Sequence, residues 1–303
     1  MKNTFFETKS LLSTLLLACP FALFSQTNPE IEKKIISEFD SVRKGSIKAS
    51  DYHFDSTNER HFLEFLKRYE DDTDSRVRSR VRIMKAKIAL QSRDGSTRQQ
   101  VVEDFARDIG DRDDAIAQYV TARLLSFKEN EFSVKAKKIM VSIFKRPNYD
   151  HDFILICGTA QLKELVPRLK KLAAGFDRTK DGWYSTTAWY ATLALARMGY
   201  AEKTDNIIAA VELELNSALR VTRLLRYLAY TRQPDCIKLL QKYLESSETL
   251  PGLRNESRGT EFNQYALEYL AFYMDDFPIK PIGIGYSKEE IEIARAFLKK
   301  KSE

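Results

Sequence analysis

The stretch that decides the fold, residues 181–244, reads DGWYSTTAWYATLALARMGYAEKTDNIIAAVELELNSALRVTRLLRYLAYTRQPDCIKLLQKYL. Apolar side chains recur in it every three or four residues, which is the spacing of one face of an α-helix. In residues 182–199 this face holds Tyr184, Ala188, Ala191, Leu195 and Met198. Short turns separate the helical segments, and each helix is too short to bury its apolar face alone. The stretch therefore predicts short helices that stack on their neighbours.

The same arrangement recurs along the chain as an Asp that stands three residues before a large apolar residue. Asp at this place can cap a helix, because its side chain accepts hydrogen bonds from the free N–H groups of the first turn. The predicted caps are Asp74, Asp113, Asp150 and Asp181, which precede the apolar anchors Val77, Ile116, Phe153 and Tyr184. In the next two units Ala218 and Gly259 take the place of the Asp, before the anchors Val221 and Phe262. A period in the thirties is typical of a helical solenoid.

Between these helices the sequence predicts a partner helix for each unit. We expect the partner helices at residues 97–109, 132–145, 162–173, 201–215 and 234–246. We divide the chain into a signal peptide (1–25), an N-terminal helix and connector (26–55), a repeat array (56–275), and a loop with a C-terminal capping helix (276–303). The fold class we predict is all-α, a right-handed α-solenoid of stacked helical hairpins.

The composition fits a folded helical chain with a mildly basic, well-mixed surface. Of 303 residues 43% are apolar and 30% charged, and 18 Phe and 14 Tyr can supply a core. Only 11 Gly and 8 Pro interrupt the helical pattern. The formal net charge of +6 is explained by solubility and does not require nucleic acid.

Residues 1–25 have the features of a secretory signal peptide. Lys2 and Lys9 precede an apolar run over residues 11–24, which is too short to span a membrane. Residues 16–19, Leu-Leu-Ala-Cys, also resemble a bacterial lipoprotein box, although Pro20 and a further apolar stretch follow Cys19. We expect an exported protein, periplasmic or extracellular, that contacts a membrane only if Cys19 is lipidated. In the remaining chain Cys157 and Cys236 stand in apolar contexts, and two buried thiols are favoured over a disulfide.

Some segments resemble the second helix of a HEAT repeat. Asp74-Ser75-Arg76-Val77-Arg78 is followed by Ala86 and Ala89, and residues 194–199, Ala-Leu-Ala-Arg-Met-Gly, are similar to the end of such a helix. The resemblance covers roughly residues 56–275 and departs from the family pattern, because the Arg after the anchor occurs only at Arg78 and Gly158 interrupts the third unit. It implies a HEAT-like fold and a role as a binding scaffold, and it carries over no active-site residue.

A basic segment and three histidines are the first candidates for chemistry. Arg76, Arg78, Arg80, Arg82, Lys85 and Lys87 could bind phosphate or an acidic partner, or they could pair with acidic neighbours such as Glu70, Asp71 and Asp72. We favour the second interpretation. His53, His61 and His151 show no metal-ligand spacing, and we expect no metal, no cofactor and no catalytic residue.

Aromatic and basic side chains in the C-terminal half give the candidate binding site. Trp189 and Tyr190 stand five and six residues after the anchor Tyr184. Arg223, Arg226 and Tyr227 stand two, five and six residues after the anchor Val221. At about 100° per residue these positions turn away from the apolar stripe. Such residues are enriched at interaction sites. We therefore predict that Trp189, Tyr190, Arg223, Arg226 and Tyr227 form one exposed binding strip, with packing between repeats as the alternative.

Together these features favour a non-enzymatic scaffold that binds a protein or peptide through the face lined by the second helices. The main alternative is a HEAT-like enzyme with a concave cleft, either similar to nucleic-acid glycosylases or a glycan-degrading enzyme with an Asp/Glu pair. The signal peptide and the mixed charge argue against a nucleic-acid partner. The sequence does not identify the partner.

Overall fold

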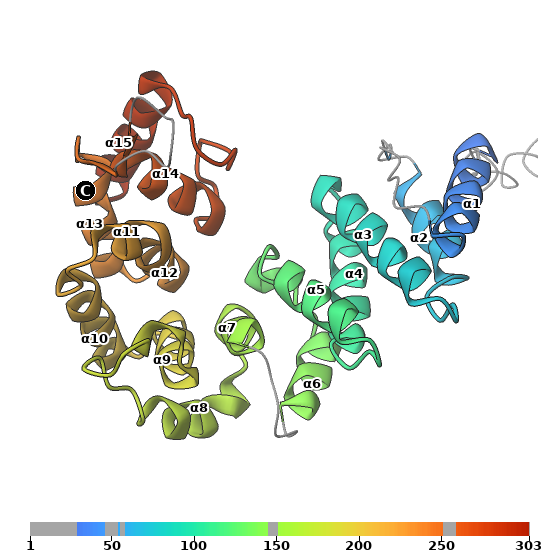
Figure 1. Ribbon diagram of the computed structural model, residues 1–303, viewed down its shortest axis with the longest axis horizontal. Coiled ribbons are helices and arrows are strands. Elements are labelled where there is room, and N and C mark those ends of the chain that lie inside the picture. The colour runs from blue at the N-terminus through green and yellow to red at the C-terminus, as the bar shows by residue number, and fades with distance from the viewer. Residues whose placement is uncertain (1–28, 46–53, 55–57, 145–150, 251–258, 303) are drawn as a thin grey trace, which may run out of the picture. The chain divides into compact units, whose positions relative to one another are not determined.

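The computed structural model describes residues 29–45, 54, 58–144, 151–250 and 259–302 (Figure 1). The protein is all-α, as predicted, and within these ranges strand structure is limited to one two-residue hairpin, β1 (Thr249–Leu250) with β2 (Thr260–Glu261). The predicted signal peptide and Asp150 lie outside the described residues. No helix among those described is long and apolar enough to cross a membrane. The chain divides into two compact units, residues 1–97 and 98–303.

The first unit contains three helices around an aromatic core. They are α1 (Pro29–Arg43), α2 (Glu59–Lys67) and α3 (Ser75–Gln91). Helix α3 packs against both of the others. Ile35 and Phe39 of α1 and Phe62 of α2 are fully buried, since apolar residues on each helix share one face. The ring of Phe39 meets that of Tyr69 edge-on at 4.8 Å. Asp74 caps α3, as predicted, by accepting a hydrogen bond from the Arg76 N–H at 2.9 Å.

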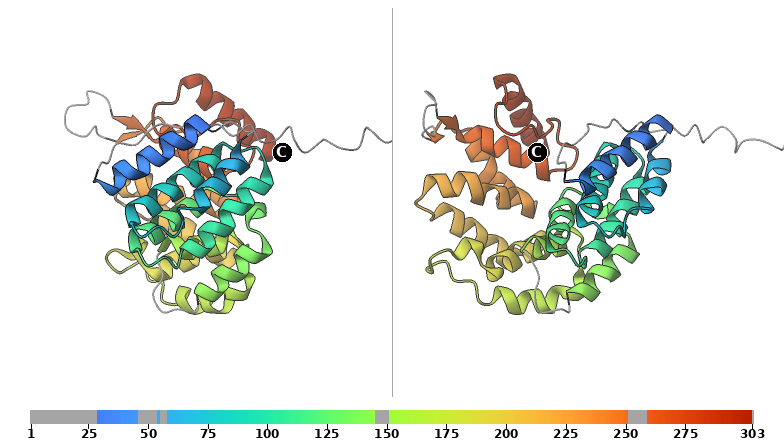
Figure 2. Two further views of the ribbon diagram at one scale, coloured as in Figure 1. Left: turned by 90° about the vertical axis from the view of Figure 1, so that its right-hand side faces the viewer. Right: turned by 45° about the vertical axis from the view of Figure 1, so that its right-hand side comes forward.

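The second unit is a succession of short helices, most of which pack on their neighbours in sequence (Figures 1 and 2). Helix α9 packs on α7, α8, α10 and α12, and α14 packs on α12, α13 and α15. The unit consists of most of α4 (Gly95–Asp108), which begins just before the boundary, followed by α5 (Asp114–Leu124), η1 (Glu129–Glu131), α6 (Val134–Ile143), α7 (His151–Thr159), η2 (Lys163–Leu165), α8 (Val166–Ala173), η3 (Trp183–Ser185), α9 (Thr187–Arg197), α10 (Ala201–Glu212), α11 (Ser217–Leu219), η4 (Arg220–Leu224), α12 (Leu225–Thr231), α13 (Pro234–Leu244), α14 (Phe262–Tyr273) and α15 (Lys288–Ser302).

The start of α9 differs from the prediction. Asp181 does not cap it, because residues 183–185 form a separate 3₁₀ turn and the α-helix begins at Thr187. The cap is Thr186, whose hydroxyl accepts a hydrogen bond from the Trp189 N–H at 3.2 Å. Trp189 therefore stands three residues after its cap, as Val77 and Ile116 do after Asp74 and Asp113. The equivalent of those anchors is Trp189, and Tyr184 was the wrong choice.

The helix that contains Val221 also differs from a regular α-helix. Residues 220–224 form a π-helical turn, η4, in which the Leu225 N–H bonds to the Arg220 carbonyl five residues earlier. A π-turn adds one residue to the helical turn, so every later side chain is rotated relative to a register counted at 3.6 residues per turn.

Gly158 lies inside α7 and does not interrupt it. An added Cβ at this position would lie 2.9 Å from the Ala194 Cα and 3.0 Å from the Ala194 carbonyl oxygen. Glycine therefore permits the close packing of α7 against α9. Cys157 and Cys236 are free and buried, as predicted, and burial raises the pKa of the Cys236 thiol to about 11.

The C-terminal helix α15 begins with a capping box. The Ser287 hydroxyl accepts from the Glu290 N–H at 3.2 Å, and the Glu290 carboxylate accepts from the Ser287 N–H at 2.8 Å. The hydrogen bonds that the Ser287 N–H and hydroxyl donate to the Glu290 carboxylate hold its pKa below its usual range. The preceding loop is fastened to α14, because Gln264 accepts from the Tyr286 N–H at 2.7 Å and Glu268 accepts from the Gly283 N–H at 2.9 Å.

Candidate functional site

The structure contradicts the predicted exposure of two of the five strip residues. Trp189 is 0% exposed and Tyr227 is 4% exposed, so both belong to the core. Tyr190 and Arg226 are partly buried, and Arg223 is exposed, with its guanidinium carbon 5.9 Å from the centre of the Tyr184 ring. The errors follow from the two register faults: Tyr184 is not on the same helix as Trp189, and the π-turn rotates Tyr227 inward. For these two residues, packing between helices was the correct interpretation.

Trp189 lies at the centre of an aromatic cluster. Its ring is 4.9 Å from Trp183, 5.3 Å from Phe176 and 6.0 Å from Tyr227 between ring centres. The contacts with Trp183 and Tyr227 are edge-on, which the ring quadrupoles favour. This cluster joins the loop before α9 to α9 and α12, so its role is to hold these elements together.

Next to this core, polar side chains of consecutive helices meet in what we term the tyrosine–arginine cluster, formed by His151, Tyr190, Arg226, Tyr227 and Tyr273. The His151 ring stacks on Tyr190 at 4.4 Å with the planes 9° apart. The Tyr190 and Tyr227 hydroxyl oxygens are 3.1 Å apart. Arg226 donates from Nη2 to the Tyr227 hydroxyl at 3.0 Å, and its guanidinium carbon lies 4.7 Å from the centre of that ring.

The electrostatics of the cluster are dominated by Arg226. Among the described residues no carboxylate forms an ion pair with it, and its Nε is buried without a hydrogen-bond partner. Burial and the hydrogen bond with Tyr227 raise the pKa of Tyr190, and burial raises that of Tyr273 to about 12, so both tyrosines stay neutral. Asp152, in the first turn of α7, is the nearby acidic group that interacts with these two tyrosines.

This arrangement offers groups that can bind a partner. It presents a cation that is positioned by a hydrogen bond and by a cation–π contact, together with tyrosine hydroxyls that both donate and accept. A carboxylate, a carbonyl oxygen or an aromatic ring of a partner could be recognised there. In the part of the chain that the structure describes, no group of three or more His, Cys, Asp or Glu is placed to hold a metal ion.

Two members of the cluster, His151 and Tyr273, were not predicted from the sequence. His151 was considered as a possible metal ligand, whereas its ring stacks on that of Tyr190. Tyr273 comes from α14, where Tyr265, Tyr269 and Tyr273 recur every four residues, and this spacing was the available signal. On the same helix, Gln264 and Glu268 hold the C-terminal loop.

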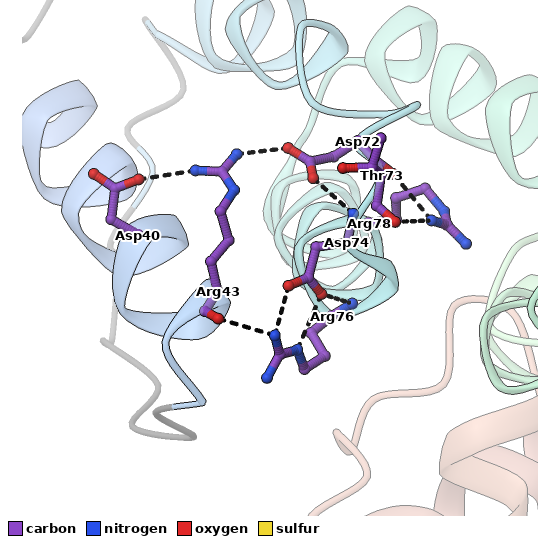
Figure 3. A network of polar contacts seen from close by, with 7 residues as sticks. All are labelled: Asp40, Arg43, Asp72, Thr73, Asp74, Arg76 and Arg78. Carbon is purple, nitrogen blue, oxygen red and sulfur yellow. Dashed lines mark hydrogen bonds and ion pairs between the residues drawn. The ribbon is translucent and has the colours of Figure 1, made fainter.

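The basic segment of α3 is engaged within the first unit, as the favoured interpretation predicted. Arg76 pairs with Asp74 at 2.6 Å, and beside it Arg43 of α1 pairs with Asp40 and Asp72 at 2.8 and 2.5 Å; Figure 3 shows how these side chains lie. Further along α3, Arg80 pairs with Glu38 and Lys85 with Glu70. Arg78 donates to the Asp72 carbonyl at 2.9 Å and Arg82 to the Glu70 carbonyl at 2.7 Å. Arg78 and Arg82 therefore stabilise the turn before α3, and Arg80 stabilises the contact between α3 and α1.

A second set of charges connects the ends of α12 and α14. Arg232, at the end of α12, forms two hydrogen bonds with the Asp275 carboxylate, and Lys128 lies 3.9 Å from the same group. Arg197 of α9 donates to the Tyr230 carbonyl at 2.7 Å. Burial, with the nearby Arg232, lowers the pKa of Arg197 to about 10. We assign this set a structural role, because each of these cations binds groups of neighbouring helices.

Comparison with known proteins gives no relative: no protein-family model matches the chain, and no curated protein or solved structure matches it either. The geometry of the tyrosine–arginine cluster is therefore the basis for a functional proposal.

Proposed function

We propose that the protein is an exported, non-enzymatic scaffold, built as a right-handed solenoid of HEAT-like hairpins, which binds a protein or peptide through the tyrosine–arginine cluster. The observation that carries this proposal is Arg226, a partly buried cation that no carboxylate of the described chain neutralises. Leaving such a group partly desolvated costs free energy, and a partner that supplies an acceptor would recover it.

The chemistry of the cluster supports a protein or peptide rather than another kind of partner. Tyrosine and arginine are among the residues enriched at the positions that contribute most to binding energy at protein interfaces. His151, Tyr190 and Arg226 come from α7, α9 and α12, which pack in succession, so one extended segment could contact all three. A nucleic acid would need several free cations to contact its phosphates, and the basic residues of α3 described above are engaged within the fold.

The pKa shifts of the carboxyl groups also support a scaffold rather than an enzyme. Those with a shifted pKa in the described ranges, Asp72, Asp74, Asp94, Glu103, Asp177 and Glu290, are all shifted downward. A glycan-degrading enzyme needs a carboxylic acid whose pKa is raised so that it can donate a proton.

The binding proposal is tested by a double variant, Tyr190→Phe with Arg226→Gln. It removes one hydroxyl and the unpaired charge but keeps the aromatic ring at position 190 and a polar, uncharged side chain at position 226. The exported protein fraction of the native cells is crosslinked to the purified parent and variant. We expect the parent to form a specific crosslinked product that the double variant loses.

Arg178→Gln is the matched control, because Arg178 is an exposed arginine in the loop after α8 and lies outside the cluster. It should crosslink as the parent does, and circular dichroism should show that both variants are folded. A folded double variant that gives the parent's crosslinked product would refute the proposed site.

Export is tested separately by the intact mass of the protein from its native cells. We expect a mature chain that begins near Gln26. A chain that retains residues 1–25 would contradict export, and an acylated Cys19 would show processing as a lipoprotein and attachment to a membrane.

A further inference from the structure

A cleft of about 600 Å³ lies in the second unit between α10, η4, α13 and the start of α14. Its volume is within the range of small-molecule sites. Leu239 and Phe262 line its apolar part and are 6% and 3% exposed. The ring of Tyr243 lies 6.4 Å from that of Phe262 between centres. The cleft is separate from the tyrosine–arginine cluster, with which it shares no residue.

The cation at this cleft is Arg220, the first residue of the π-turn. Its guanidinium lies near the Tyr243 hydroxyl and interacts with it electrostatically, while its Nε is buried without a hydrogen-bond partner. None of the carboxylates in the described ranges forms an ion pair with it. A π-turn is an irregularity within an α-helix, and such turns are frequent at functional sites. A guanidinium with an unused donor at the lining of a cleft matches a carboxylate, which can accept two parallel hydrogen bonds from it.

The lining of the cleft also contains three glutamates, and two of them have partners. Glu212 lies 4.0 Å from Lys242, and Glu245 lies 3.1 Å from Arg295. Glu248 is exposed, and its carboxylate has no ion-pair partner in the part of the chain that is described. The cleft therefore combines one unpaired cation, one unpaired anion and an apolar wall.

We propose that this cleft binds a small zwitterion, a free amino acid or a short peptide with an apolar side chain. The ligand's carboxylate pairs with Arg220, its ammonium group with Glu248, and its side chain packs on Phe262 and Leu239. A phosphate dianion fits less well, because the lining carries three carboxylates against Arg220 and Lys242, a formal charge of −1. Charge repulsion would oppose a ligand without a cationic group.

The test uses calorimetric titration of the full chain with L-leucine and L-leucyl-L-leucine. Two analogues remove one ligand charge each: N-acetyl-L-leucine lacks the ammonium group and L-leucinamide lacks the carboxylate. We expect one-to-one binding of leucine or the dipeptide and at least about tenfold weaker binding of both analogues, since each loses a paired charge.

Two variants assign the charges to residues. In Arg220→Gln, leucine and leucinamide should bind equally weakly, because the group that recognises the carboxylate is gone. In Glu248→Gln, leucine and N-acetylleucine should no longer be distinguished. Arg178→Gln and Glu202→Gln, at exposed positions outside the cleft, are the charge-matched controls and should bind as the parent does.

Several results would overturn the proposal. They are the absence of binding of both leucine and the dipeptide up to about 10 mM, tighter binding of inorganic phosphate than of leucine, and an unchanged analogue preference in either folded variant. If Arg220→Gln does not fold, Arg220→Lys keeps the charge but loses the bidentate fork, and leucine should still bind at least several-fold more weakly to it.

Discussion

At the scale of single residues, Gly158 is the position where the fold depends most directly on one side chain being absent. Helices α7 and α9 approach so closely there that a Cβ would contact the Ala194 backbone at 2.9 and 3.0 Å and the Tyr230 hydroxyl. That hydroxyl donates to the Leu155 carbonyl at 2.5 Å, so it is itself held in place. Neither the backbone nor this hydroxyl can move away without loss of packing or of a hydrogen bond.

We therefore expect Gly158→Ala to lower the free energy of unfolding by about 1–3 kcal/mol, the usual cost of overpacking a core. Urea unfolding followed by circular dichroism measures it. Gly175→Ala is the control, because the nearest atoms to its added Cβ are 3.7 and 3.9 Å away. That change should be neutral or slightly stabilising. Equal stability of the two variants would contradict the close contact of α7 and α9.

At the scale of the element, the start of α9 shows how a single cap sets the register. The Thr186 hydroxyl satisfies the Trp189 N–H, whereas Asp181 is exposed and precedes a separate 3₁₀ turn. Thr186→Ala should cost about 1 kcal/mol as a lost cap, and Asp181→Ala should change stability by less than about 0.5 kcal/mol. Thermal melts compare the stability of the two variants. A larger loss of stability for Asp181→Ala than for Thr186→Ala would show that Asp181 is the cap, as the sequence predicted.

A second element, the start of α3, gives a prediction for pH. Hydrogen bonds from the Arg76 side chain and N–H lower the pKa of Asp74 from 3.8 to about 2. A lowered pKa means that the ionised carboxylate stabilises the fold above about pH 4, and that this contribution disappears as the pH falls from about 4 to about 2. Asp74→Asn should lack it at every pH, so the difference in urea midpoint between parent and variant should shrink over this interval. A difference independent of pH would contradict the ion pair.

The element scale also shows what the sequence could predict and what it could not. Partner helices were placed to within a few residues, because their apolar periodicity and the turns beside them are local signals: residues 234–246 were predicted and α13 spans Pro234–Leu244. Caps were found where a single Asp preceded a continuous helix, as at Asp74 and Asp113. The 3₁₀ break before Thr186 and the π-turn at Arg220 depend on tertiary packing, so the register after each of them was wrong. Tyr190 and Arg226 kept some exposure, while Trp189 and Tyr227 did not.

At the scale of the whole molecule, the proposed solenoid makes a prediction within the second unit. In such an array each helix is stabilised mainly by its neighbours. Leu298 of α15 is 2% exposed, and α15 packs on α13 and α14. Leu298→Ala should lower the free energy of unfolding by about 2–5 kcal/mol, because it removes buried packing. It should speed amide hydrogen exchange in α13, α14 and α15, while exchange in α7 stays as in the parent.

Leu215→Ala is the matched control, because Leu215 is 95% exposed and the same atoms are removed without loss of burial. It should leave exchange unchanged throughout. Faster exchange in α7 of the Leu298→Ala variant, to the same extent as in α14, would show that the second unit unfolds as one globular domain.

The aromatic cluster around Trp189 has a consequence for how the protein can be observed. Trp183 and Trp189 are the chain's two tryptophans, and they lie edge-on to each other in the second unit. Trp189 is fully buried, and its indole N–H has no hydrogen-bond partner in the described part of the chain. Light absorbed selectively by tryptophan therefore excites only the second unit, and its emission should be blue-shifted and largely inaccessible to iodide. A fluorescence melt thus records the second unit, whereas a far-ultraviolet circular dichroism melt of the same sample records the helices of both units.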